Sequence, residues 1–304
     1  MAAPSDSARG SKTRPGLRAG ILIAKLLATL ALFAALFAQE QFSWASLGEE
    51  LRRVELARFL PWLGLAVLLK LLGIFGNIWR WQLLLRGQDL HLSYRFLCGS
   101  FFVGRFFGIV TPGTLGLDGF KLYDSIRATR KPIPCGAVLL IDKLVGLVSL
   151  TALLLLVFPM AWGIFDLLDP SRALAVGLAS LVAVGTFFAL LLAPQLSRPL
   201  LRVVPGARLS GLAERLHSAA MAYSSRRGVL LSAVGLAAVG HVTTALMYWS
   251  LLCGMSPPDA TGPGMLTVLF VALLMTSATL VAPTIGGEGV REASFALLLE
   301  GLVP

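Results

Sequence analysis

The chain has 304 residues, of which 56% are hydrophobic and 14% are charged, and its formal net charge is +10 at pH 7. Soluble domains carry about 25% charged residues, so this composition and a mean hydropathy of +0.80 exclude an ordinary soluble globule. The apolar residues gather into runs near the length of a membrane-spanning helix, and the basic residues lie beside those runs, which favours membrane orientation over nucleic-acid binding. We therefore expect an all-α polytopic integral membrane protein.

The first 18 residues are rich in Ser, Ala, Gly and Pro and are basic. We expect residues 1–18 to be a disordered cytoplasmic tail and residues 19–304 to form a single membrane domain. Because basic residues precede the first apolar run, the positive-inside rule places the N-terminus in the cytoplasm. The cysteines form no CxxC pair and the histidines are scattered, so the sequence predicts no metal site and no cofactor.

About six to seven membrane helices are expected, including one or two re-entrant hairpins. The full crossings are predicted, in chain order, at Ile21–Ala38, Phe59–Ile78, Cys135–Phe158, Ala173–Ala193 and Val229–Cys253.

A re-entrant hairpin is predicted between the second and third of these runs. The apolar part, Phe96–Val110, has about 15 residues, which is too short to span a bilayer. The stretches on both sides, RWQLLLRGQDLHLSYR and FKLYDSIRATRKP, are basic and look like cytoplasmic loops. A short helix would therefore enter, break between Thr111 and Gly119, and return, with Pro112, Gly113 and Gly116 supplying the break. The GRFFG sequence has the spacing of small residues that allows close helix packing.

A second break is predicted near the C-terminal end, in the stretch APTIGGEGVRE. It follows the borderline apolar run Met265–Val281, which could either span the membrane or re-enter it. The break residues are Pro283, Gly286, Gly287 and Gly289. Two opposite-facing breaks would fit an inverted repeat, which the sequence allows without establishing it.

Several charged residues lie within apolar stretches, where an unpartnered charge costs about 2.5–3.5 kcal/mol. Lys70 is interpreted as a structural residue whose side chain snorkels. Asp142 and Lys143 are adjacent and point about 100° apart on a helix, so they cannot share one partner, and at least one should meet a cavity or the broken loop. Arg105 lies in the predicted hairpin.

Near the second break, Glu288, Arg291 and Glu292 have the spacing of one helical turn. They could simply cap the helix that follows. A glycine-rich break before a helix start also directs backbone N–H groups at an anion, which suits a phosphate-bearing headgroup.

Four segments, RWQLLL, TPGTLGLDGFKLY, IDKLVGL and PTIGGEGVREASF, together resemble the flippase-like membrane domain of lysylphosphatidylglycerol synthases and its stand-alone relatives. Two positions depart from the family pattern: Leu117 intervenes between the glycine and acid of the first break, and Lys143 replaces an arginine, which loses bidentate phosphate geometry. The soluble aminoacyl-transferring domain is not in this chain, so aminoacyl transfer is not expected. Relatives continue beyond the position of Pro304, so the chain is expected to be a short or a truncated member.

The resemblance implies an integral protein of the inner (cell) membrane. The leading hypothesis is a lipid translocase without enzymatic activity, which moves a phosphate-bearing lipid or a lipid-linked intermediate between leaflets. The alternative is a non-transporting membrane subunit that presents lipid to, or scaffolds, a glycosyltransferase or lipid-modifying enzyme. The expected partners are accordingly membrane lipid and, in the alternative, such an enzyme. The predicted substrate-binding residues are Arg80, Arg105, Lys121, Lys143 and Arg291, and the acids that balance or gate the cavity are Asp118, Asp142, Glu288 and Glu292.

Overall fold

The computed structural model describes residues 54–110, 115–158, 226–256 and 264–281, together with residues 52, 178, 221 and 223. Within these ranges the chain is all-helical and contains no strand, which confirms the predicted fold class. The crossings predicted at Ile21–Ala38 and Ala173–Ala193 lie outside the described ranges.

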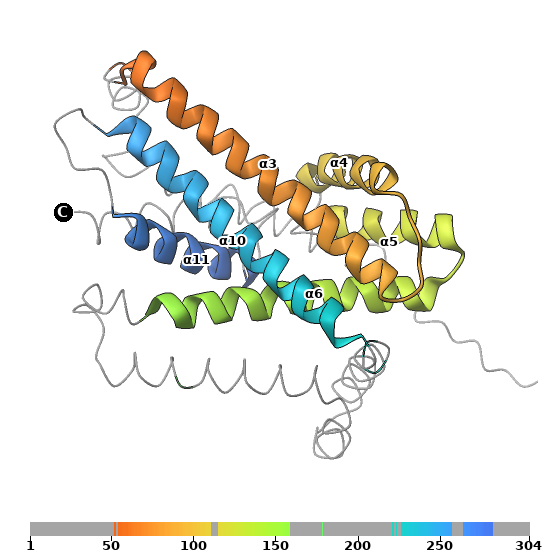
Figure 1. Ribbon diagram of the computed structural model, residues 1–304. Helices are drawn as coiled ribbons and strands as arrows, with labels where there is room; N and C mark the ends of the chain where they lie inside the picture. Colours follow the sequence, from red (N-terminus) through yellow and green to blue (C-terminus); the bar gives the residue numbers. More distant parts are fainter. Residues whose placement is uncertain are drawn as a thin grey trace, which may run out of the picture.

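Three described helices are long and apolar enough to cross a membrane: α3 (Leu56–Arg86), α6 (Pro132–Val157) and α10 (Arg227–Met255). They confirm the crossings predicted in these regions of the sequence. A fourth apolar helix, α11 (Met265–Val281), has 17 residues and coincides with the predicted borderline run. Figure 1 shows α10 lying along α3 in the opposite direction, with α6 and α11 beside α10.

The second predicted crossing was too short at its C-terminal end. Helix α3 continues through Arg86, so the whole of the stretch RWQLLLR is helical rather than part of a loop. The reason is burial, because Trp81, Leu84 and Leu85 lie in the core and are at most 2% exposed. The chain turns after this helix at Asp89, whose φ of 55° lies in the left-handed region.

Helices α4 (Tyr94–Val110) and α5 (Leu115–Thr129) form a hairpin. In Figure 1 the hairpin starts and finishes near the end of the bundle that holds the C-terminus of α3 and the N-terminus of α6, as a re-entrant hairpin requires. Gly104 allows close packing, since a Cβ there would lie 3.1 Å from side-chain carbons of Leu117 and Phe120. The GRFFG spacing therefore does permit close approach, and the partner is the other arm of the hairpin.

The hairpin also corrects the predicted extent of the break. Helix α5 begins at Leu115, so Gly116 lies in its first turn, and the stretch FKLYDSIRAT, expected to be a loop, is helical. Pro112 and Gly113 lie outside the described residues. The helix is stabilised by contacts that composition does not reveal, because Lys121 and Ser125 are buried on the side of α5 that meets the bundle.

Helices α3 and α10 make the most extensive contact between described elements. Glycines allow this close approach, since a Cβ on Gly73 would lie 2.8 Å from Thr243 Oγ1, and one on Gly254 would lie 2.9 Å from Trp62 Cβ. The rings of Trp62 and Trp249 pack edge to face with centroids 5.6 Å apart. Helices α4 and α6 pack against α3, and helices α6 and α11 pack against α10.

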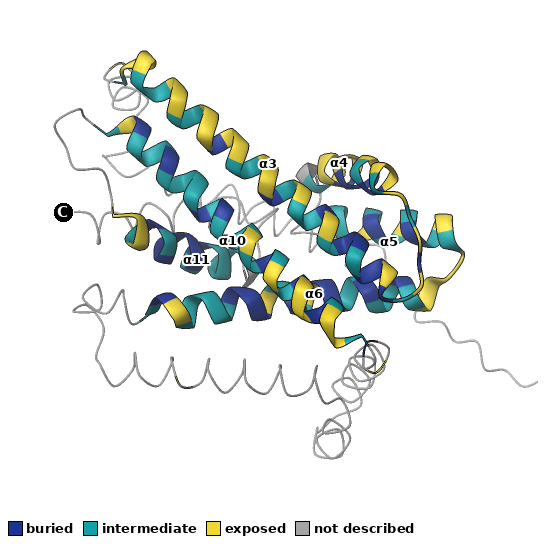
Figure 2. Cartoon of the chain, in the orientation of Figure 1, coloured by how far each residue is buried: buried dark blue, intermediate teal, exposed yellow. Residues whose placement is uncertain are grey.

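One side of α3 presents large apolar side chains to the surroundings, visible as the exposed positions along this helix in Figure 2. They recur every three or four residues and so form one stripe: Leu65, Leu68, Leu72, Phe75 and Trp79. In a membrane domain such a stripe faces lipid, whose hydrocarbon chains are as apolar as the side chains themselves.

Hydrogen bonds and an ion pair join the segment before α10 to the C-terminal end of α3. The Tyr223 hydroxyl donates a hydrogen bond of 2.7 Å to the carbonyl oxygen of Leu84, and the Arg226 guanidinium donates to the carbonyl oxygen of Arg86 at 2.9 Å. Arg226 also pairs with Asp89 at 2.8 Å. The segment before α10 therefore lies at the same end of the bundle as the basic stretch after α3, which was predicted to be cytoplasmic.

Candidate functional site

A buried carboxylate on α6 holds two cations from different helices. Asp142 Oδ1 accepts a hydrogen bond of 2.8 Å from Arg80 Nε on α3, and Asp142 Oδ2 accepts one of 2.9 Å from Lys121 Nζ on α5. The side chains of Lys121 and Asp142 are 6% and 5% exposed, and that of Arg80 is 13% exposed. We call Arg80, Lys121 and Asp142 the charge cluster.

The charge cluster carries more positive than negative charge, since two cations share one carboxylate. The Lys121 ammonium also lies over the ring of Trp81, with its Nζ 4.7 Å from the ring centroid. A cation in that position is attracted by the electron-rich face of the indole. The ring and the carboxylate together explain how a lysine can be buried on the inner side of α5.

A second ion pair joins the same two helices closer to the start of α5. Lys143 on α6 pairs with Asp118, which lies in the first turn of α5. The Lys143 side chain is 44% exposed and that of Asp118 is 13% exposed. The adjacent residues Asp142 and Lys143 thus have different partners, as predicted, and Lys143 reaches the helix start that follows the predicted break.

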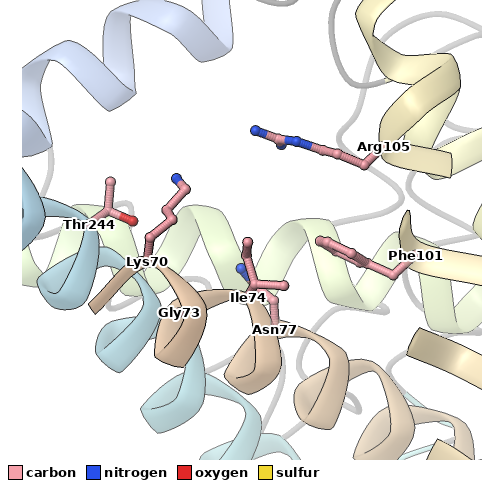
Figure 3. A pocket seen from close by; sticks show the side chains of 7 residues that line it. All are labelled: Lys70, Gly73, Ile74, Asn77, Phe101, Arg105 and Thr244. Atoms are coloured by element: carbon pink, nitrogen blue, oxygen red, sulfur yellow. The ribbon is translucent and has the colours of Figure 1, made fainter. Parts of the chain in front are cut away.

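A small cavity lies where α3, α4 and α10 meet. Its volume is about 70 Å³, and in Figure 3 the side chains of Lys70 and Arg105 extend toward each other from α3 and α4. The lining residues, which define what we call the cationic cavity, are Lys70, Gly73, Ile74, Asn77, Phe101, Arg105 and Thr244.

The predicted site residues divide into three groups. Arg80, Lys121, Asp142, Lys143 and Asp118 are brought together in two ion-paired groups between α5 and the bundle. Arg105 lies instead in the cationic cavity. The residues of the predicted second break lie outside the described ranges: Pro283, Gly286, Gly287, Glu288, Gly289, Arg291 and Glu292.

Lys70 lines the cationic cavity beside Arg105. Its interpretation as a structural residue whose side chain snorkels stays a prediction. The sequence offers a signal for its place in the cavity, because Asn77 follows seven residues later and Arg80 ten residues later. At 100° per residue these three fall within one sector of about 80° on α3, so the helix carries a polar stripe.

Within the described ranges, no group of three or more His, Cys, Asp or Glu side chains is arranged to hold a metal ion. His241 on α10 instead contacts the carbonyl oxygen of Gly146 on α6 at 3.1 Å. The Arg and Lys side chains of the two ion-paired groups and of the cavity are groups that can bind an anion.

Comparison with known proteins identifies the family. The family described as the lysylphosphatidylglycerol synthase TM region matches residues 19–304, so this chain belongs to it. No curated protein matches the chain. No solved structure matches it either.

Proposed function

We propose that this member of the lysylphosphatidylglycerol synthase TM region family is a lipid translocase, which moves a phosphate-bearing lipid or lipid-linked intermediate between leaflets. The chain is a membrane protein by its family and by its apolar helices. The observation that carries the proposal is the charge cluster, in which Arg80 and Lys121 share a single carboxylate in a nearly buried position.

The surplus positive charge supports an anionic substrate. Charged groups inside a membrane protein face the protein interior or a water-filled cavity, pair with one another and mark substrate pathways. Arginine presents several N–H donors in a fixed fork, and lysine supplies a compact charge, so together they suit the oxygens of a phosphate. A phosphate at this position would balance the charge that Asp142 alone leaves over.

The ion pairs of α5 support a link between substrate binding and motion of the hairpin. The phosphate of the substrate would compete with Asp142 for Lys121. Lys121 holds α5 to Asp142 on α6, and Asp118 at the start of α5 holds Lys143. A phosphate that takes over Lys121 weakens one of these two attachments. Substrate binding would thereby loosen α5 from the bundle, which links occupancy of the site to motion of the hairpin. The proposal assigns transport to the chain and includes no catalytic step.

The test is leaflet exchange in vesicles that contain the full chain. Vesicles of phosphatidylcholine and phosphatidylglycerol would carry a fluorescent phosphatidylglycerol, and dithionite would quench the label in the outer leaflet. We expect faster loss of the protected signal than in protein-free vesicles. Lys121→Gln should slow the exchange about tenfold, the effect of removing one hydrogen bond to a charged group.

The matched control is Arg127→Gln, which removes an exposed cation from the same helix. It should exchange lipid as the unchanged protein does. Exchange no faster than in protein-free vesicles, or equal exchange by Lys121→Gln and the unchanged protein, would contradict the proposal. Lipid binding without exchange would favour the alternative role of presenting lipid to a membrane enzyme.

A further inference from the structure

The two arms of the hairpin pack into one unit. Helices α4 and α5 make more extensive contact with each other than either makes with any other described helix. A Cβ on Gly104 would lie 3.1 Å from Leu117 Cδ1 and from Phe120 Cβ, so the backbones approach as closely as side chains allow. The rings of Phe107 on α4 and Phe120 on α5 stack with centroids 5.7 Å apart. The arms are therefore expected to move together if they move at all.

Both connections between the hairpin and the bundle pass through a left-handed residue. Asp89, which follows α3, has a φ of 55°, and Arg130, which follows α5, has a φ of 60°. Among the described residues these are the only non-glycine residues with a positive φ. Glycine is the usual residue where a helix ends in this conformation, because a Cβ is disfavoured there. The backbone is thus strained at both ends of the hairpin.

The first of these strained residues is held by a side chain from outside the hairpin. The Arg226 guanidinium pairs with the Asp89 carboxylate at 2.8 Å and donates a hydrogen bond of 2.9 Å to the carbonyl oxygen of Arg86. Both side chains of the ion pair are reached by solvent, at 39% and 69% exposure. Salt screens such an exposed pair much more than a buried one. The segment before α10 therefore stabilises the strained turn by an interaction that conditions can weaken.

We propose that the α4–α5 hairpin swings as one rigid unit about Asp89 and Arg130, between a position latched to α6 and a released position. Hinge residues are typically a few residues at the ends of helices that absorb the change in φ and ψ. When the hairpin leaves the latched position, these two residues leave the left-handed region and the strain is relieved. The relief offsets part of the attachment to α6, which brings the two positions close in free energy.

The latches are the two ion pairs that join α5 to α6, namely Lys121 with Asp142 and Asp118 with Lys143. Asp118 precedes Arg130 by twelve residues, so it lies about 18 Å from this hinge along the helix. A rotation of about 15°, the size of a known rigid-body transition, would move Asp118 by about 5 Å. That displacement is enough to separate an ion pair.

Apolar packing does not prevent this motion. Leu97 and Phe101 on the inner side of α4 are buried in the core. In a membrane, lipid hydrocarbon replaces apolar contacts that separate, so the separation lacks the hydrophobic cost that it has in water. The ion pairs and the strained turns therefore decide which position the hairpin occupies.

This inference goes beyond the proposed transport and can be tested without a transported lipid. A hairpin that swings in a chain that exchanges no lipid would support the hinges and contradict the translocase. Lipid exchange by a chain whose hairpin keeps one fixed position would do the reverse.

The experiment measures distances between paired spin labels by double electron–electron resonance. The full chain, with its three native cysteines replaced by alanine, is placed in phosphatidylcholine nanodiscs. Phe106→Cys with Leu156→Cys joins the hairpin to α6, and both positions are 69% exposed. Phe106→Cys with Arg127→Cys measures the hairpin itself. We expect two maxima about 5 Å apart for the first pair and a single maximum for the second.

Variants of the latch and of the hinge should shift the two maxima in opposite directions. Asp118→Asn should raise the ratio of released to latched hairpin about threefold, since it removes a partly exposed ion pair. Arg130→Gly should lower that ratio about tenfold, because glycine adopts the left-handed conformation without the steric cost. The matched controls are Asp124→Asn and Ala128→Gly on the same helix, which should leave the ratio unchanged.

The hold on the first hinge has its own test. Arg226→Gln should raise the released fraction up to about threefold. Added sodium chloride should have the same effect on the unchanged protein and a smaller effect on this variant. Arg227→Gln neutralises the adjacent exposed arginine and is the matched control.

Three results would overturn the inference. The first is one unchanged distance between hairpin and bundle in the unchanged protein and in Asp118→Asn. The second is a distance within the hairpin that varies as much as the distance to α6, because the hairpin would then not be rigid. The third is a released fraction that Arg130→Gly raises or leaves unchanged, because strain at this residue would then play no part. If Asp118→Asn does not fold, Arg130→Gly carries the comparison, since glycine accommodates the observed φ.

Discussion

Replacing Asp142 with asparagine is expected to lower the free energy of unfolding by about 3–5 kcal/mol, the effect of removing one partner from a buried ion pair. The carboxylate is bound by Arg80 Nε at 2.8 Å and by Lys121 Nζ at 2.9 Å, in a position where Asp142 is 4% exposed. In the variant, two nearly buried cations would face a neutral amide and each other. The loss should lie at the upper end of the range because both pairs share this one carboxylate.

The same reasoning predicts that the partners are not equivalent. Lys121→Met should cost about 2 kcal/mol or less, because Arg80 and Asp142 remain as a neutral pair and the methionine occupies a similar volume. An exposed pair supplies the control. Asp89 and Arg226 have side chains 69% and 39% exposed, so Asp89→Asn should change the stability by about 0–1 kcal/mol.

The assay is equilibrium unfolding of the full chain in mixed micelles, titrated with dodecyl sulfate and followed by circular dichroism. The expected order of destabilisation is Asp142→Asn, then Lys121→Met, then Asp89→Asn. The reasoning fails if Asp142→Asn unfolds at the same dodecyl sulfate fraction as Asp89→Asn. It also fails if Lys121→Met is as destabilising as Asp142→Asn, because a shared carboxylate could not then be what holds the cluster together.

Two further predictions concern helix packing and use the same titration. Gly104→Ala should destabilise the chain by about 1–3 kcal/mol, because its Cβ would lie 3.1 Å from side-chain carbons of α5. Gly99→Ala on the same helix, where no atom lies within 4 Å, should be neutral or stabilising by up to about 1 kcal/mol; equal effects of the two would refute close packing of the hairpin. Gly73→Ala should likewise destabilise, since its Cβ would lie 2.8 Å from Thr243 Oγ1, whereas Gly76→Ala meets nothing within 4 Å. If the two variants on α3 unfold together, the α3–α10 contact is looser than the structure has it.

The sequence predicted the membrane helices well because hydropathy and helix breaks are local signals. The runs that became α6 and α10 were recognised within a few residues, and α11 was predicted with the bounds that it has. The extension of α3 was missed because Arg80 and Arg86 look like loop residues when only neighbouring positions are considered. In the structure Arg80 is a helical residue that pairs with Asp142, which is 62 residues away in the sequence, so neighbouring positions could not reveal the partner.

Local signals in the sequence predicted part of the candidate site as well. Adjacency alone showed that Asp142 and Lys143 must face different partners, since one residue rotates a helix by about 100°. Adjacency could not identify those partners, because Lys121 and Asp118 come from a helix that was expected to be a loop. The cavity beside Lys70 could not be predicted, because a snorkelling lysine and a cavity lysine have the same neighbours in the sequence and differ only in what α4 and α10 place beside them.

An anion that reaches the charge cluster must compete with a carboxylate that is already bound there. Asp142 lies between Arg80 and Lys121, and removing one partner from a buried ion pair costs about 3–5 kcal/mol. An anion is therefore expected to share the two cations with Asp142 rather than to displace it.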